Sequence, residues 1–224
     1  MRKLSVARTR WVLVVAAVTL LVRVAFAGPG LQGKFKTLGK AQLVSGGISP
    51  HERAADLTSN CGAEPFNATC YNDPTWVFSG VGFTPKGSLT LAGITTLSTD
   101  YNMNGTDCSG GSPRFVIITN SHNYVANFGH PPYGGGCYYG WQNTGNFTST
   151  ADGTLRWQID LANTFDSWST VVASHGTEMV TEINIILDAG WIAPRGQDVT
   201  IDNYTVNNKV MEAEDAFPHG HDHE

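Results

Sequence analysis

Short runs of apolar residues recur through this chain, each bounded by Gly, Pro, Asn or Asp. The clearest run covers residues 154–161, where every second side chain is apolar: Leu155, Trp157, Ile159 and Leu161. Strict alternation is typical of a β-strand with one face in a core and the other in water. Several such strands at this spacing predict an all-β fold, a two-layer antiparallel β-sandwich with a jelly-roll-like arrangement.

Other segments fit the same interpretation. In residues 181–191, Ile183, Ile185 and Leu187 alternate with polar side chains, which again predicts one buried face. Residues 113–120 are apolar on both faces, as is typical of a central strand. The remaining predicted strands lie within residues 88–102, 123–128 and 198–206.

One segment, residues 49–57, carries helix signals instead. Ser49 fits an N-cap, Pro50 fits the first helical position, and Glu52 follows the cap by three residues. We therefore expect one short N-terminal helix ahead of the strands.

The N-terminus predicts export. Four basic residues among the first ten precede an apolar run at residues 11–22, and residues 25–27 read Ala-Phe-Ala, a small-x-small cleavage site. An uncleaved membrane anchor is the alternative, but the run is shorter than the roughly 20 residues that a bilayer requires. We expect residues 1–27 to be a secretory signal peptide and the mature chain to be extracellular.

The charge of the mature chain limits its partners. Removing residues 1–27 takes away five basic residues and no acidic one, so nine Lys and Arg face nineteen Asp and Glu, a formal charge of −10. Binding to phosphates depends on clustered cations, and the sequence shows no run of Lys or Arg. We expect neither nucleic acid nor a membrane as a partner, and the sequence leaves the oligomeric state open.

Composition divides the exported chain into three parts. Residues 28–47 are rich in Gly and Lys and are predicted to be a flexible lead-in, and residues 48–211 form a single β-sandwich domain. Residues 212–224 are polar and acidic, so a disordered tail is expected. The alternating His219, His221 and His223 are candidate ligands for a transition metal ion, with a merely solvated tail as the alternative.

Four cysteines lie in the exported part: Cys61, Cys70, Cys108 and Cys137. An even number in an oxidising compartment predicts two disulfides, with three possible connectivities. We favour Cys61 with Cys70 and Cys108 with Cys137, since each link would join one loop to another. Zinc binding is disfavoured because no Cys-x-x-Cys pair is present.

Catalytic motifs are weak, and we lean against an enzyme. A sandwich glycoside hydrolase needs two carboxyl groups about 5–10 Å apart, one of them protonated. Glu178 and Glu182 are close in sequence, but they lack the Glu-x-Asp-x-Glu pattern of the laminarinase type. The pairs Ser121-His122 and Ser174-His175 are predicted to lie in turns, and no Gly-x-Ser-x-Gly or His-Glu-x-x-His is present. A glycoside hydrolase or lyase stays a minor alternative.

Residues 129–147, which we call the aromatic loop, are the best binding candidate. They hold five aromatic residues and six glycines, and they contain no Lys, Arg, Asp or Glu. Sugar rings stack on aromatic side chains, and their hydroxyl groups require amides nearby. The candidate ligand-binding residues are Tyr133, Tyr138, Tyr139, Trp141, Gln142 and Asn143. The competing interpretation is that these aromatic residues fold inward and cap one end of the sandwich.

Residues 199–206, VTIDNYTV, resemble the closing strand of the galactose-binding-like jelly-roll carbohydrate-binding modules. The resemblance covers about eight residues, and it implies a β-sandwich that binds sugars or surfaces. It also implies a structural calcium ion held in part by Asp202, since calcium prefers oxygen ligands.

We therefore expect a secreted, non-catalytic β-sandwich that binds carbohydrate or another extracellular surface through the aromatic loop. The alternative is a structural or adhesive extracellular protein with no small ligand. Asn67, Asn104, Asn146 and Asn203 each begin a glycosylation sequon, and a glycan on Asn146 would obstruct the aromatic loop.

Overall fold

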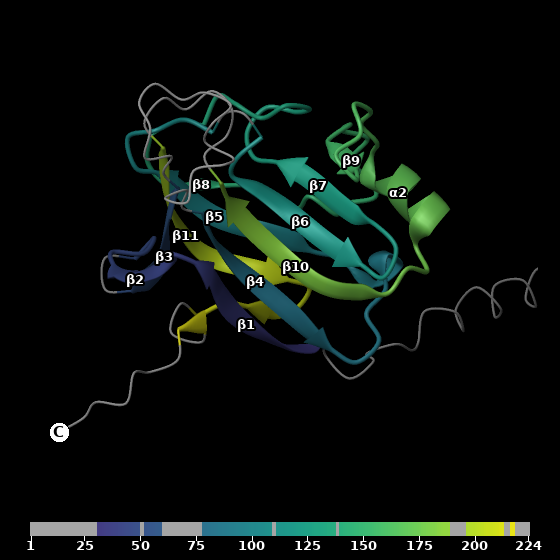
Figure 1. Ribbon diagram of the computed structural model, residues 1–224, viewed down its shortest axis with the longest axis horizontal. Coiled ribbons are helices and arrows are strands. Elements are labelled where there is room, and N and C mark those ends of the chain that lie inside the picture. Colours follow the sequence, from purple (N-terminus) through teal and green to yellow (C-terminus); the bar gives the residue numbers. More distant parts are fainter. Residues whose placement is uncertain are drawn as a thin grey trace, which may run out of the picture. The chain divides into compact units, whose positions relative to one another are not determined.

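The predicted two-layer antiparallel β-sandwich is confirmed. The computed structural model describes residues 31–49, 52–59, 78–108, 111–137, 139–188, 196–212 and 216–217. From Leu31 onward the described residues form one compact unit, whose strands lie in two antiparallel sheets (Figure 1). Within these ranges no helix is both long and apolar enough to cross a membrane.

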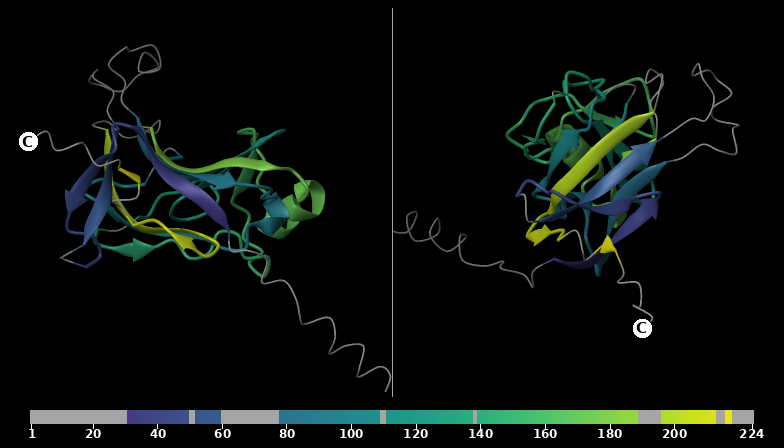
Figure 2. Two further views of the ribbon diagram at one scale, coloured as in Figure 1. Left: turned by 90° about the horizontal axis from the view of Figure 1, so that it is seen from below. Right: turned by 90° about the vertical axis from the view of Figure 1, so that its left-hand side faces the viewer.

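The first sheet has the strand order β1-β4-β10-β6-β7-β9. Its strands are β1 (Gln32–Gly39), β4 (Ser79–Lys86), β6 (Arg114–Thr119), β7 (Asn123–Asn127), β9 (Trp157–Ile159) and β10 (Val180–Leu187). The second sheet has the order β2-β3-β11-β5-β8, with β12 paired to β11. Its strands are β2 (Gln42–Ser45), β3 (Arg53–Ser59), β5 (Leu97–Met103), β8 (Gln142–Asn143), β11 (Gln197–Val206) and β12 (Lys209–Val210). Figure 2 shows the two layers from the side.

The core lies between the two sheets. As predicted, β6 occupies the interior of its sheet, and the inward side chains of β10 are completely buried. Phe115 of β6 packs against the rings of Phe128 and Phe147, with ring centroids 4.9 Å and 5.1 Å apart. Tyr204 of β11 donates a hydrogen bond of 2.7 Å to the carbonyl of Ile183 on β10, which links the sheets directly.

The predicted N-terminal helix is wrong. Within residues 49–57, the described part from Arg53 onward belongs to β3, which pairs with β2 on one side and with β11 on the other. Ala55 and Leu57 point into the core and Asp56 points outward. Hydrogen bonds to two neighbouring strands outweigh the local helix signals, because helix propensity is a weak preference that tertiary packing overrides.

The predicted flexible lead-in is also wrong over Gln32–Gly39 and Gln42–Ser45, which form β1 and β2. The ring of Phe35 explains why this segment is ordered. Its centroid lies 5.1 Å from that of Phe83 and 5.4 Å from that of Tyr204. The strand β1 was not predicted because its few apolar residues alternate with lysine and glycine, a composition that is typical of a flexible segment.

Helix α2 (Trp168–His175) was not predicted. Its N-cap is Ser167, whose hydroxyl accepts a hydrogen bond of 3.2 Å from the backbone N–H of Thr170. The helix buries Trp168 against Trp157 of β9, with ring centroids 5.0 Å apart. It lies at the end of the first sheet where β6 ends and β10 begins (Figure 1). The short 3₁₀ helix η2 (Leu91–Gly93) contacts it.

Residues 154–161 form a shorter strand than predicted. Only Trp157–Ile159 pair with β7, and Leu155 and Leu161 are 56% and 64% exposed. The predicted disordered tail is wrong at Ala216 and Phe217, which pack against the core. Several predicted features lie outside the described residues: the signal peptide at residues 1–27, Cys61, Cys70, Tyr138, His219, His221 and His223.

Candidate functional site

A disulfide anchors the middle of the aromatic loop. Cys108 and Cys137 are bonded as predicted, with their Cα atoms 5.4 Å apart, and both are buried. The backbone N–H of Cys137 also donates a hydrogen bond of 3.0 Å to Asp107. These bonds fix the centre of the loop to the segment that follows β5.

The second half of the loop is held along β5. Gln142 and Asn143 form β8 and pair with Tyr101 and Asp100. The side chain of Asn143 donates a hydrogen bond of 2.7 Å to Asp100, and the hydroxyl of Tyr101 donates one of 3.3 Å to Gln142. These two predicted binding amides therefore also keep the loop in place.

The aromatic side chains of the loop divide between the two interpretations. Phe147 is 4% exposed and belongs to the core, as a cap would require. Tyr133 and Tyr139 are 69% and 79% exposed, as a binding surface would require. Trp141 is half-buried, and the ring of Tyr133 is supported edge-on by Phe165 at a centroid distance of 5.0 Å.

The outer face of the second sheet is polar beside this loop. Strand register places Asp56 of β3, Thr200 of β11 and Asn102 of β5 directly across from one another. The backbone N–H of Gly140, which follows Tyr139, donates a hydrogen bond of 3.0 Å to the side chain of Asn102. The backbone beside the exposed Tyr139 is thus attached to a face rich in hydroxyl, amide and carboxyl groups.

This face also carries a pair of carboxyl groups that the sequence did not reveal. Burial, then the negative charge of Asp198 and a hydrogen bond to it, raise the pKa of Asp56 to about 6. A glycoside hydrolase needs its two carboxyl groups about 5–10 Å apart, with room for water or sugar between them. Asp56 and Asp198 are in direct hydrogen-bond contact, so this pair does not match that spacing.

Asp202 has a structural role. Its carboxylate accepts hydrogen bonds from the backbone N–H groups of Ile48 at 2.9 Å and Asn203 at 2.8 Å. Calcium requires six to eight oxygen ligands. Among the described residues, Asp202 belongs to no cluster of three or more potential metal-ligating side chains. The calcium ion that the family resemblance implies at Asp202 therefore stays a prediction.

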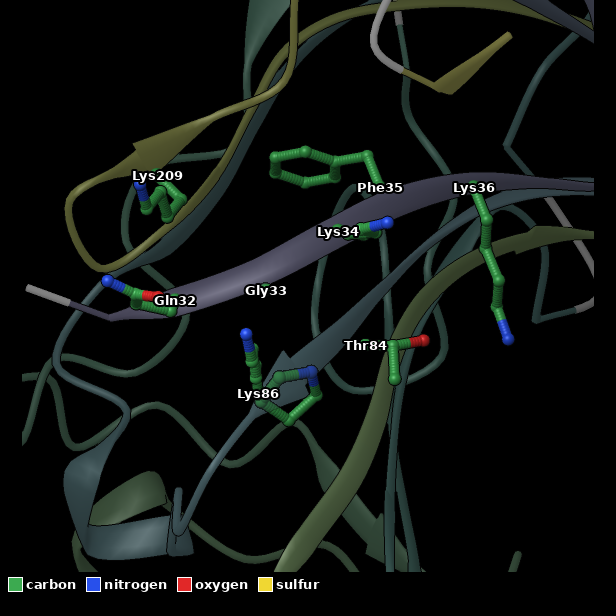
Figure 3. Close-up of a pocket in the computed structure, with 9 residues that line it drawn as sticks. Gln32, Gly33, Lys34, Phe35, Lys36, Thr84, Lys86 and Lys209 are labelled. Atoms are coloured by element: carbon green, nitrogen blue, oxygen red, sulfur yellow. The ribbon is translucent and has the colours of Figure 1, made fainter. Parts of the chain in front are cut away.

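A groove of about 770 Å³ lies at the edge formed by β1 and β4. It brings Lys34 and Lys36 of β1 together with two lysines that are distant in sequence, Lys86 and Lys209 (Figure 3). Lys36 forms an ion pair with Glu182 of β10. The sequence contains no lysine cluster, but the fold assembles one on this edge of an otherwise acidic chain.

A second polar cluster lies at the end of the first sheet, beside α2. Glu178 is at its centre, and its Oε1 atom lies 2.9 Å from Nδ1 of both His122 and His175. Its Oε2 atom accepts hydrogen bonds from the hydroxyls of Tyr124 at 2.9 Å and Thr119 at 2.7 Å. We refer to these five residues as the Glu178 cluster.

The Glu178 cluster is partly open to solvent. The side chains of His122, His175 and Glu178 are 34%, 27% and 13% exposed. The two imidazole rings lie 5.1 Å apart and are nearly perpendicular, at 73°. Each of these three residues offers one ligand atom, and the three atoms lie within 4.8 Å of one another.

The charge state of Glu178 follows from its partners. Burial opposes its ionisation, but hydrogen bonds from Thr119, His122, His175 and Tyr124 outweigh burial and hold its pKa at about 2. In turn, burial and the hydrogen bond to this carboxylate raise the pKa of Tyr124 far above its usual value. Glu178 is therefore a stable anion with a fixed orientation.

Sequence reasoning missed this cluster. It placed His122 and His175 in turns and considered Glu178 only as a possible partner of Glu182. Glu178 lies 56 residues from His122, so only the fold brings them together. The spacing of three residues between His175 and Glu178 was the one local signal.

Fold and loop together define a class of protein, a disulfide-bonded β-sandwich with exposed tyrosines on an anchored loop. Comparison with protein families, curated proteins and solved structures found no match to this chain. Function must therefore be argued from the sites themselves.

Proposed function

We propose that this chain is a non-catalytic extracellular protein that binds a glycan or a glycan-bearing surface through the aromatic loop. The observation that carries the proposal is the exposure of Tyr139, at 79%, on a loop that is covalently anchored at Cys137. The Cys108–Cys137 disulfide supports an oxidising compartment.

Anchoring matters because binding pays an entropic cost for every group that it orders. The disulfide, the Gly140 hydrogen bond and the β8 pairing already restrain the backbone around Tyr139. Tyrosine has only two side-chain torsions, so it presents a large ring at low entropic cost. A sugar that stacks on Tyr139 would therefore meet a preorganised ring.

The polar groups around Tyr139 suit a ligand with many hydroxyl groups. Asp100 and Asn102 lie on the outer face of the second sheet, and Asn143 lies beside them on β8. A carboxylate accepts hydrogen bonds from hydroxyl groups, and a side-chain amide both donates to them and accepts from them. A ring for stacking and a polar face for hydrogen bonds are the two requirements of a sugar site.

The test is a glycan array followed by titration of any ligand found, with the half-buried Trp141 as a fluorescence reporter. Tyr139→Ala is expected to weaken binding by about tenfold or more, as for an anchor residue at an interface. Leu155→Ala is the matched control, because Leu155 is a large exposed side chain like Tyr139, at 56%, but lies outside the loop. Binding by the wild type that is unchanged in Tyr139→Ala would refute the role of the loop.

The alternative is a structural or adhesive protein without a small ligand. It is favoured by the internal bonds of Gln142 and Asn143, whose side chains already hold β5 to β8. This function predicts no binding on the array and no fluorescence change with any sugar. The two functions are therefore separated by the same measurement.

A further inference from the structure

We propose that His122, His175 and Glu178 form a binding site for a divalent transition metal ion, with Zn²⁺ preferred. The key observation is convergence: Nδ1 atoms from two different segments both lie 2.9 Å from the same carboxylate oxygen, Oε1. Two imidazoles and one carboxylate are also the three-ligand set typical of zinc sites that keep a fourth position open.

The spacing is close to what a tetrahedral ion requires. With bonds of about 2.1 Å to each ligand, ligand atoms around zinc lie about 3.4 Å apart. The two Nδ1 to Oε1 distances are 2.9 Å, and all three ligand atoms lie within 4.8 Å of one another. Each Nδ1 to Oε1 distance would have to lengthen by about half an ångström to reach this spacing.

The protonation states are compatible with binding. Without metal, each imidazole donates its Nδ1–H to Glu178; with metal, each neutral imidazole would carry its proton on Nε2 and ligate through Nδ1. This is a change of tautomer that needs no net loss of protons from neutral imidazoles. The two oxygens of Glu178 have four hydrogen-bond partners among the cluster residues, an environment that suits a carboxylate ligand.

The outer residues of the cluster orient the carboxylate. Tyr124 and Thr119 both donate to Oε2, which leaves Oε1 directed at the two histidines. Groups that hold a ligand in this way typically raise metal affinity by about 10–100-fold. The exposed fractions of His122 and His175, 34% and 27%, leave a path for the ion and for a water as fourth ligand.

The ligand set also selects among cations. Calcium and magnesium prefer oxygen ligands, and two imidazole nitrogens favour the later transition metals. The site is distinct from the aromatic loop, so its test does not depend on glycan binding.

The test requires a background in which the C-terminal histidines cannot chelate metal. We would use the mature full chain with His219→Ala, His221→Ala and His223→Ala, and titrate Zn²⁺ in competition with a chromophoric chelator. The expected result is one zinc ion per chain and a rise in melting temperature with zinc. Ca²⁺ is expected to produce neither effect.

Matched variants distinguish a metal site from a hydrogen-bonded cluster. In that background, His122→Asn and His175→Asn each keep an N–H donor for Glu178 but lose a ligand, so zinc affinity should fall by more than about tenfold. Their far-UV circular dichroism and zinc-free melting temperature should be unchanged. Tyr124→Phe keeps the ring and loses the hydroxyl, with an expected fall of about tenfold. The control His130→Ala, in an exposed loop position, should bind as the background does.

Two results would overturn the proposal. One is a background chain that binds no zinc in the presence of intact secondary structure. The other is a double variant, His122→Asn with His175→Asn, that binds zinc as tightly as the background.

Discussion

The aromatic loop and the Glu178 cluster lie on the same sandwich but are assembled in different ways. The loop is contiguous, covers residues 129–147, and has no acidic or basic side chain other than His130. The Glu178 cluster draws its members from β6, the turn between β6 and β7, β7, α2 and the segment before β10, and its centre is an anion. The loop exposes Tyr133 and Tyr139, whereas the cluster encloses its carboxylate with four donors.

A β-sandwich can therefore form a candidate site in two ways, from one contiguous loop or from residues of distant segments. Exposed positions of a contiguous loop can vary with little effect on the fold once the loop is anchored, as the disulfide anchors the centre of this one. A cluster built from distant segments ties those segments together, so its loss affects both stability and any function. Exposed residues of the loop should therefore affect binding, and the centre of the cluster should affect folding.

The largest effect is expected from Glu178→Ala. This change leaves the donors of Thr119, Tyr124 and two histidines without their acceptor in a mostly buried place, which should cost about 3–4 kcal/mol of unfolding free energy. Urea unfolding measures the loss directly. Glu182→Ala is the control, because Glu182 pairs with Lys36 where the two side chains are 31% and 38% exposed. The control should cost less than about 1 kcal/mol, and equal losses would mean that the Glu178 cluster has no special role.

The second effect is expected from the double substitution Cys108→Ser with Cys137→Ser. The disulfide joins residues 29 apart in sequence, and the entropy of such a loop corresponds to about 3.6 kcal/mol of unfolding free energy. Hydrogen exchange should show the loss of protection at residues 129–147 while α2 keeps its protection. Uniform loss of protection in both regions would contradict the separation between the loop and the cluster.

Sequence patterns predicted the parts of the fold that depend on local alternation. The strands β10 and β11 were predicted because apolar residues occupy every second position on their buried face, such as Ile183, Ile185 and Leu187 on β10. The strand β3 was mistaken for a helix because Ser49, Pro50 and Glu52 are local signals, while its hydrogen bonds to β2 and β11 are not local. Strand formation depends on partners that a single segment does not contain.

The same limit applied to the candidate sites. Composition identified the aromatic loop, but it could not tell that Phe147 faces the core while Tyr139 faces solvent. Neither the Glu178 cluster nor the Asp56–Asp198 pair could be predicted, because each joins residues far apart in the sequence. Only the favoured Cys108–Cys137 link gave a correct long-range contact.

The carboxyl group of Asp56 contrasts with that of Glu178, because Asp56 lacks the hydrogen-bond donors that surround Glu178. Its pKa is raised from 3.8 to about 6, so the folded protein holds this proton more tightly than the unfolded chain. The associated stability is complete below pH 3.8 and is lost as pH rises through 6. Asp56→Asn removes the repulsion from Asp198 and should stabilise the protein by about 1–2 kcal/mol at pH 8, after allowance for solvent screening.

Urea midpoints of the wild type and Asp56→Asn between pH 4 and pH 8 would measure this difference. The curves should lie close together at the acidic end and separate as pH rises through about 6. A constant separation across the range would show that Asp56 does not titrate in the way its surroundings imply.

The smallest effect on stability is expected from Tyr139→Ala, although it is the variant expected to lose the most binding. The ring is 79% exposed, so folding removes little of its apolar surface from water, and its deletion should change unfolding free energy by about 0.5 kcal/mol or less. Phe147→Ala, from the same loop, is the matched contrast, because its ring is 4% exposed and its loss should cost about 3 kcal/mol or more. Chemical denaturation of both variants measures the contrast. A large loss for Tyr139→Ala would show that the ring supports the loop rather than serving a ligand.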